Sequence, residues 1–130
     1  MSIRGTFEIE ITPGHSLLPG TGRFDFTKVW EGDILGASKG VMISAGDPAS
    51  GTAGYVCMEA FEGEIGGKLG TLAFQQLGTM DHGNQGLRYI VVPGSGTGDL
   101  EGTIGVVNLT VDEDAGPHSV VQALSSARCP

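Results

Sequence analysis

Glycine is the residue that most constrains how this chain folds. It accounts for 23 of the 130 residues, against roughly 7% in an average protein. A glycine inside a helix costs about 1 kcal/mol relative to alanine, and glycines interrupt almost every window long enough to form a helix. The sequence therefore predicts extended segments joined by turns, in which glycine is a favoured residue.

Short runs of alternating apolar and polar residues follow one another along the chain, with turn sequences such as GDPASG and DHGNQG between them. This period-2 pattern is typical of half-buried strands. The predicted strands span residues 6–11, 22–32, 34–45, 53–64, 69–78, 86–96, 102–112 and 118–125. Links of hairpin length, without crossover helices, predict an antiparallel meander. Because closure removes exposed edges, we expect an all-β, eight-stranded antiparallel barrel forming one domain over residues 1–130.

Charge and hydropathy exclude several classes of partner. Fifteen acidic residues against seven basic ones give a net charge of −8, which disfavours nucleic acids and anionic membrane surfaces. No apolar run is long enough for a transmembrane helix. The N-terminal sequence lacks the apolar stretch of a signal peptide, so we expect a cytoplasmic protein in which Cys57 and Cys129 are free thiols.

Cofactor motifs are also missing from the sequence. The three histidines are far apart and show no metal-ligand spacing. The glycine-rich GSGTG (94–98) resembles a nucleotide loop, but no helical pattern follows it to receive a pyrophosphate. We therefore expect neither a metal nor a nucleotide cofactor.

Glu59 is the strongest candidate for chemistry. Alternation places it on one face of a strand with Tyr55, Cys57 and Phe61. Burial among such neighbours would raise the pKa of a carboxyl group and suit it to general acid–base catalysis. Two alternatives stay open, because this face could point outward, or Glu59 could be a salt-bridged structural residue.

Gln76 is the second polar candidate. It shares a side of its strand with Leu72 and Phe74, so we expect it to face the interior. There its amide would either orient a ligand carbonyl or be a hydrogen-bonded part of the core.

The remaining candidates could contact a ligand or serve the fold. They are Trp30, Cys57, Phe74, Tyr89, Ser95, Thr97 and His118. The aromatic residues would stack on a ligand or pack in the core, and tyrosine hydroxyls could donate to an oxyanion. Cys57 would be a nucleophile or an inert buried thiol. His118 would reach the mouth of the barrel or lie on the surface.

The phrase VVPGSGTGDLEGTIG (91–105), with RGTFEIE, GYVCMEAFEG and GKLGTLAFQQLGT elsewhere, resembles a family of small bacterial proteins classed as a domain of unknown function. The resemblance covers roughly residues 4–122. It implies an allene oxide cyclase-like, calycin-like barrel. The plant enzymes that share this barrel hold and cyclise an unstable fatty-acid epoxide, and they assemble into oligomers. The resemblance therefore also implies a homo-oligomer.

The function expected from these observations is binding of an apolar or amphipathic small molecule in the barrel lumen. Isomerase or cyclase activity would follow if Glu59 acted as acid or base and if Tyr55 and Gln76 oriented the substrate. Because fold alone does not fix function, two alternatives remain. The protein could be a non-catalytic carrier, or a structural or interaction barrel whose lumen is filled by side chains.

Overall fold

The chain folds into long strands that run from one turn almost directly into the next. The computed structural model describes residues 2–111 and 119–128, with side chains over residues 3–109. The strands are β1 (Ser2–Gly14), β2 (Thr21–Gly32), β3 (Ile34–Asp47), β4 (Thr52–Ile65), β5 (Lys68–Asp81), β6 (Asn84–Val91), β7 (Thr103–Val111) and β8 (Ser119–Arg128), with short 3-10 helices η1 (Pro48–Ser50) and η2 (Gly98–Leu100). Every predicted strand range overlaps one of these strands.

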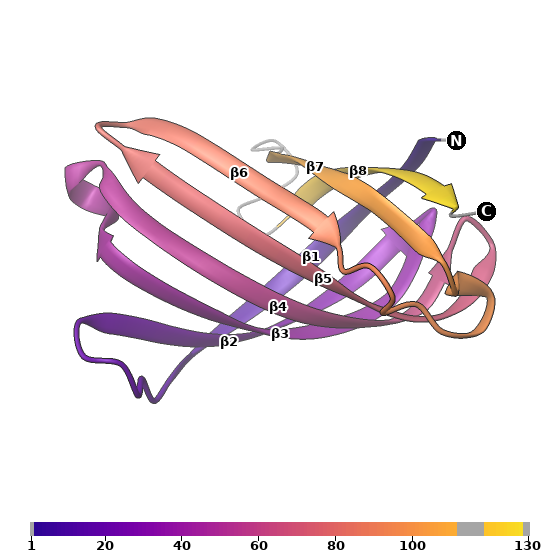
Figure 1. Ribbon diagram of the computed structural model, residues 1–130, viewed down its shortest axis with the longest axis horizontal. Coiled ribbons are helices and arrows are strands. Elements are labelled where there is room, and N and C mark those ends of the chain that lie inside the picture. The colour runs from indigo at the N-terminus through magenta and orange to yellow at the C-terminus, as the bar shows by residue number, and fades with distance from the viewer. Residues whose placement is uncertain (1, 112–118, 129–130) are drawn as a thin grey trace.

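The strands pair in chain order, and each pair is antiparallel. Hydrogen-bonded neighbours run from β1 to β8, and β1 also pairs with β8. β6 and β7 pair over a short stretch, in which Ile90 lies opposite Val106. The predicted all-β antiparallel meander is therefore confirmed, and Figure 1 shows how β2 to β5 curve alongside one another.

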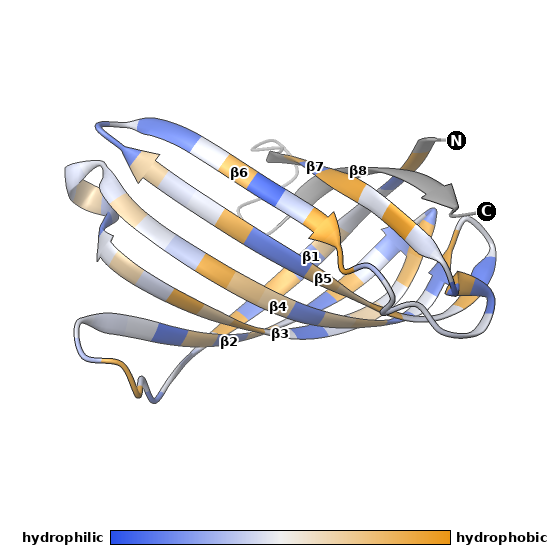
Figure 2. Cartoon of the chain, in the orientation of Figure 1, coloured by the Kyte–Doolittle hydropathy of each residue, from blue (hydrophilic) through white to orange (hydrophobic). Residues whose placement is uncertain are grey.

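One face of the curved sheet carries the core, and we call it the inner face. Along β4, Cys57, Glu59 and Phe61 are buried while their neighbours are exposed, so the predicted alternation is confirmed. Hydropathy changes repeatedly along the strands for the same reason (Figure 2). The buried apolar cluster consists of Ile3, Phe7, Trp30, Ile34, Phe61, Ile65, Leu72, Phe74, Tyr89, Val91, Leu100 and Val107. Burying each large side chain contributes about 1.5–3 kcal/mol.

This core lies toward one end of the strands, which we call the packed end. The β2–β3 and β4–β5 turns, the 92–102 segment, the start of β1 and the end of β8 gather there (Figure 1). Leu100 of that segment is buried in the core. A Cβ on Gly70 of β5 would stand 2.0 Å from the carbonyl oxygen of Thr97, so glycine lets the segment approach β5. The opposite end, with the connections at 15–20, 48–51 and 82–83, is the hairpin end.

The predicted strand over 86–96 is too long, because β6 ends at Val91. Pro93 has no N–H and cannot continue a hydrogen-bonded ladder. The chain therefore bulges away from β5 and returns to it: the backbone N–H of Val92 donates to Ala73, and that of Thr97 donates to Thr71.

Two glycines face each other across β3 and β4 near the packed end. Gly36 pairs with Gly63, and their φ angles are 152° and 153°. Residues with a side chain essentially never adopt this conformation. The pair therefore permits a backbone geometry that other residues would oppose.

Candidate functional site

An ion pair lies inside the apolar core, on the inner face. The Lys28 ammonium on β2 donates to Glu59 Oε1 on β4 at 3.0 Å, and the two side chains are only 4% and 1% exposed. Tyr89 on β6 donates to the same carboxylate oxygen at 2.9 Å and accepts from Lys28 at 3.1 Å. Ser38 donates to Glu59 Oε2 at 2.5 Å and accepts from the Trp30 indole at 3.0 Å. Glu59 is therefore a salt-bridged carboxylate with three donors.

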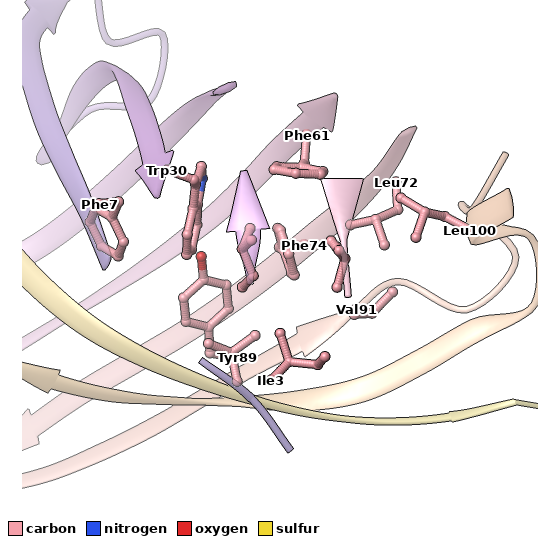
Figure 3. Packing of buried hydrophobic residues seen from close by; sticks show 12 residues of the cluster. Ile3, Phe7, Trp30, Phe61, Leu72, Phe74, Tyr89, Val91 and Leu100 are labelled. Carbon is pink, nitrogen blue, oxygen red and sulfur yellow. The ribbon is translucent and has the colours of Figure 1, made fainter. Parts of the chain in front are cut away.

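Aromatic rings surround the Lys28 ammonium. Its nitrogen lies 4.2 Å from the centre of the Phe7 ring, and 5.1 to 5.5 Å from the rings of Phe26, Trp30 and Tyr89. Such contacts stabilise a cation electrostatically. With two hydrogen bonds and the Phe7 ring close by, the ammonium is enclosed by the chain itself. Figure 3 shows Tyr89 directed toward Phe7 and Trp30.

Tyr89 is held in its neutral form. Burial raises its pKa well above the usual value of 10.0, and the negative charge of Glu59 raises it further. The hydroxyl group therefore stays protonated and donates a hydrogen bond to Glu59. We call Lys28, Ser38, Glu59, Tyr89 and Trp30 the buried polar network.

A second polar pair lies nearer the hairpin end of the inner face. Gln76 Nε2 on β5 donates to the hydroxyl oxygen of Tyr55 on β4 at 2.6 Å. The Tyr55 ring covers Gly78, its partner on β5, where a Cβ would stand 2.2 Å from the ring. Both side chains are partly buried. Among the described residues, Tyr55 makes no other hydrogen bond, so none of them accepts its O–H proton.

The pKa of Tyr55 is raised above 10.0, chiefly by burial and also by nearby Cys57, while the Gln76 hydrogen bond lowers it. At neutral pH the hydroxyl is therefore protonated and can donate. A hydroxyl that already accepts one hydrogen bond becomes a better donor through polarisation. The pair offers a directed hydrogen bond to a group placed beside it.

Apolar side chains near this pair remain accessible to solvent. Ile11 and Leu87 are 52% and 43% exposed, and Phe24 and Met42 are only partly buried. All four alternate in register with core residues of their strands and so belong to the inner face. The inner face therefore has a packed half around the buried polar network and an open half around Tyr55 and Gln76.

Cys57 sits between Tyr55 and Glu59 on the same face of β4, and it is a free, buried thiol. Burial raises its pKa from 9.0 to about 11, against the lowering effect of Lys28. Nucleophilic attack requires a thiolate, so the protonated Cys57 is a poor nucleophile near neutral pH.

We expect stability to fall as the pH rises above about 9. The folded-state pKa of Cys57 is raised to about 11, so the unfolded chain loses this proton first and is favoured in that interval. Urea unfolding between pH 8 and 11 should show a shallower pH dependence for Cys57→Ala than for the original chain. Parallel curves for the two proteins would contradict this assignment.

The other predicted site residues lie elsewhere. Phe74 belongs to the core, with its ring centre 5.5 Å from that of Tyr89. Ser95 Oγ accepts from Ala73 N and donates to Val92 O, and Thr97 Oγ1 accepts from Thr71 N. These two hydroxyls hold the bulged 92–102 segment on β5 at the packed end. His118 and Cys129 lie outside the described residues.

Sequence reasoning missed Lys28 and Ser38. Lys28 had a signal, because Phe24, Phe26, Lys28 and Trp30 alternate in one strand and so share a face. Ser38 had no such signal. It links Trp30 and Glu59 only because the strand register places β3 between β2 and β4.

Neither a metal site nor a membrane helix is found in the part of the chain that the structure describes. Over these residues, no three His, Cys, Asp or Glu side chains are grouped to hold a metal ion. No helix there has the length and apolar character needed to cross a membrane.

Comparison with known proteins identifies relatives but no established activity. Residues 3–121 match the family described as "Protein of unknown function (DUF3224)". A crystal structure of a DUF3224 protein of unknown function from Shewanella oneidensis MR-1 is similar over 100% of this chain and 98% of that one, with 29% identity and a TM-score of 0.89. No curated protein matches the chain. The predicted relation to a family of unknown function is confirmed, and the chain belongs to the DUF3224 family.

Proposed function

We propose that this protein binds an apolar or amphipathic small molecule against the open half of its inner face. The observation that carries the proposal is the coexistence of accessible apolar side chains with an unused hydroxyl donor. Leu87 pairs with Gly78, the residue under the Tyr55 ring. The exposed Leu87 side chain and the Tyr55 hydroxyl donor therefore lie on neighbouring strands of the same face. Most small-molecule sites combine apolar walls with a few placed polar groups.

The proposal includes a closed, eight-stranded, calycin-like barrel of the allene oxide cyclase type. The pairing of β1 with β8 and the chain-order pairing of the other strands support closure. In such a barrel, the packed core would form the floor of the site, and the hairpin end would form its mouth. Eight strands give an interior that is just wide enough for one small ligand.

Catalysis by this site would be an isomerisation or cyclisation without a cofactor. Tyr55 would donate a hydrogen bond to a carbonyl or epoxide oxygen, with Gln76 positioning it, while the walls hold a flexible chain in one shape. Glu59 would act as a positioning residue, because its carboxylate is buried and already receives three hydrogen bonds. A carrier function would use the same contacts without turnover.

A hydrocarbon dye tests whether the open half binds a ligand. We expect diphenylhexatriene to bind saturably and to fluoresce on binding. Leu87→Trp should weaken binding about tenfold or more, because the larger ring would occupy the site. Leu35→Trp is the matched control, since Leu35 lies on the outer face of β3 and is 51% exposed.

Two results would count against binding at this site. Absence of dye binding in the original chain would favour a barrel filled by its own side chains. Equal weakening by Leu87→Trp and Leu35→Trp would place the dye elsewhere. Native mass spectrometry of the purified protein would also reveal a retained small molecule.

Self-association and a cytoplasmic location stay predictions. Two outer-face grooves, of about 560 and 420 Å³, both include Met58, which is 54% exposed next to the exposed Val56 and Leu77. Exposed apolar surface of this kind supports association with a second copy. The native mass spectra would report the assembly's mass directly.

A further inference from the structure

We infer that the ligand of the open half is an uncharged molecule that presents a hydrogen-bond acceptor, such as a ketone, aldehyde, ester or epoxide, and not a carboxylate. This inference rests on the proposed function and names its ligand class. Three observations support it: the uncharged side chains of the open half, the pairing of Lys28 with Glu59, and the Tyr55 hydroxyl proton, which no described residue accepts.

The open half carries no ionised side chain among the residues that the structure describes. Its inner-face positions include Ile11, Phe24, Met42, Tyr55, Gln76 and Leu87. A carboxylate bound against these groups would lose water without gaining an opposite charge, which is unfavourable. The net charge of −8 would also repel an anion from the protein as a whole.

Lys28 is the cation on the inner face that an anionic ligand could pair with, but its ammonium group already interacts with side chains of the protein. Its ammonium donates to Glu59 and Tyr89 and lies 4.2 Å from the centre of the Phe7 ring. It is 4% exposed, and the Glu59 charge balances its own. A ligand carboxylate would have to displace Glu59, which would leave that buried carboxylate without its counter-ion.

Tyr55 supplies the complementary group for a neutral acceptor. Its oxygen accepts from Gln76 at 2.6 Å, and no residue that the structure describes accepts its proton, which is therefore left for a ligand. Its raised pKa keeps that proton in place at neutral pH. A carbonyl or ether oxygen can accept this hydrogen bond without carrying a charge.

The test compares 2-undecanone with decanoate as competitors of bound diphenylhexatriene. We expect the ketone to displace the dye at a concentration at least about tenfold lower than decanoate, because the carboxylate has no cation to pair with. Tyr55→Phe should weaken the ketone about two- to tenfold, the range of one neutral hydrogen bond. The dye has no acceptor atom, so its own affinity should stay unchanged in this variant.

A charge-introducing variant sharpens the test. Gln76→Lys would place a cation beside Tyr55, and we expect it to strengthen decanoate binding and reverse the preference. Gln75→Lys is the matched control, because the adjacent Gln75 is exposed on the opposite face of β5 and the change in net charge is the same. Gln75→Lys should leave the preference for the ketone intact.

The outcomes separate this inference from the proposed function. If the dye does not bind, the proposed function fails and the inference fails with it. If the dye binds but decanoate competes as well as the ketone, binding at the open half stands and the neutral-ligand inference is overturned. If Gln76→Lys and Gln75→Lys changed the preference for the ketone over decanoate equally, the inference would also be overturned. The effect would then come from the net charge of the protein and not from a cation beside Tyr55.

Discussion

Lys28→Met is expected to lower the free energy of unfolding by about 3–5 kcal/mol, the usual cost of removing one partner from a buried ion pair. The variant keeps an apolar stem of similar length within the aromatic surroundings, so little packing is lost. The effect arises because Glu59, at 1% exposure, stays buried but loses its counter-ion. Urea unfolding followed by Trp30 fluorescence would measure it.

The double variant Lys28→Met/Glu59→Gln is expected to recover much of this loss. The glutamine carbonyl can still accept a hydrogen bond from Ser38 or Tyr89, while the uncompensated charge is gone. Lys39→Met is the control, because Lys39 is exposed on β3, and its cost should stay within about 0.5 kcal/mol. A double variant as unstable as Lys28→Met would show that charge pairing is not the cause.

Gly63→Ala is expected to cost about 2–6 kcal/mol or to prevent folding. A φ of 153° is open essentially to glycine alone and costs other residues about 1–3 kcal/mol. The added Cβ would also stand 2.2 Å from the carbonyl oxygen of Leu35, and relieving such overlap costs typically about 1–3 kcal/mol more. Both strands would have to separate at the Gly36–Gly63 pair.

Gly54→Ala in the same strand is the matched control. Its φ is not positive, and a Cβ there would lie 3.5 Å from the nearest atom, which is ordinary contact. Alanine gives the unfolded chain less conformational entropy than glycine, so this substitution should stabilise the fold by about 0.4–1 kcal/mol. Thermal unfolding of both variants would check the contrast, and similar losses at the two positions would refute the steric argument.

Alternation in the sequence predicted much of the fold, because the pattern acts within a single strand. The run from Tyr55 to Phe61 placed Glu59 on one face with Cys57 and Phe61 and left its direction open, and the structure buries that face. The same logic placed Gln76 on the side of Phe74. Strand pairing in chain order followed from short links that leave no room for a crossover.

The partners of these residues were beyond such reasoning. Glu59 meets Lys28 and Tyr89 only because β2, β4 and β6 curve around a shared interior, and this curvature is a property of the whole sheet. Ser95 and Thr97 were expected at a ligand, yet their hydroxyls serve backbone groups of the 92–102 segment and β5. Pro93 signalled this departure from the strand in the sequence.

The division of the inner face into packed and open halves has an evolutionary consequence. The apolar cluster and the charged pair that hold the strands together lie in the packed half, whereas Phe24, Met42 and Leu87 of the open half lie outside that cluster. Under the proposed function, substitutions at these three positions would change the ligand that the protein binds, with little effect on its folding. If that proposal holds, relatives that share the packed half could bind different ligands through changes in the open half alone.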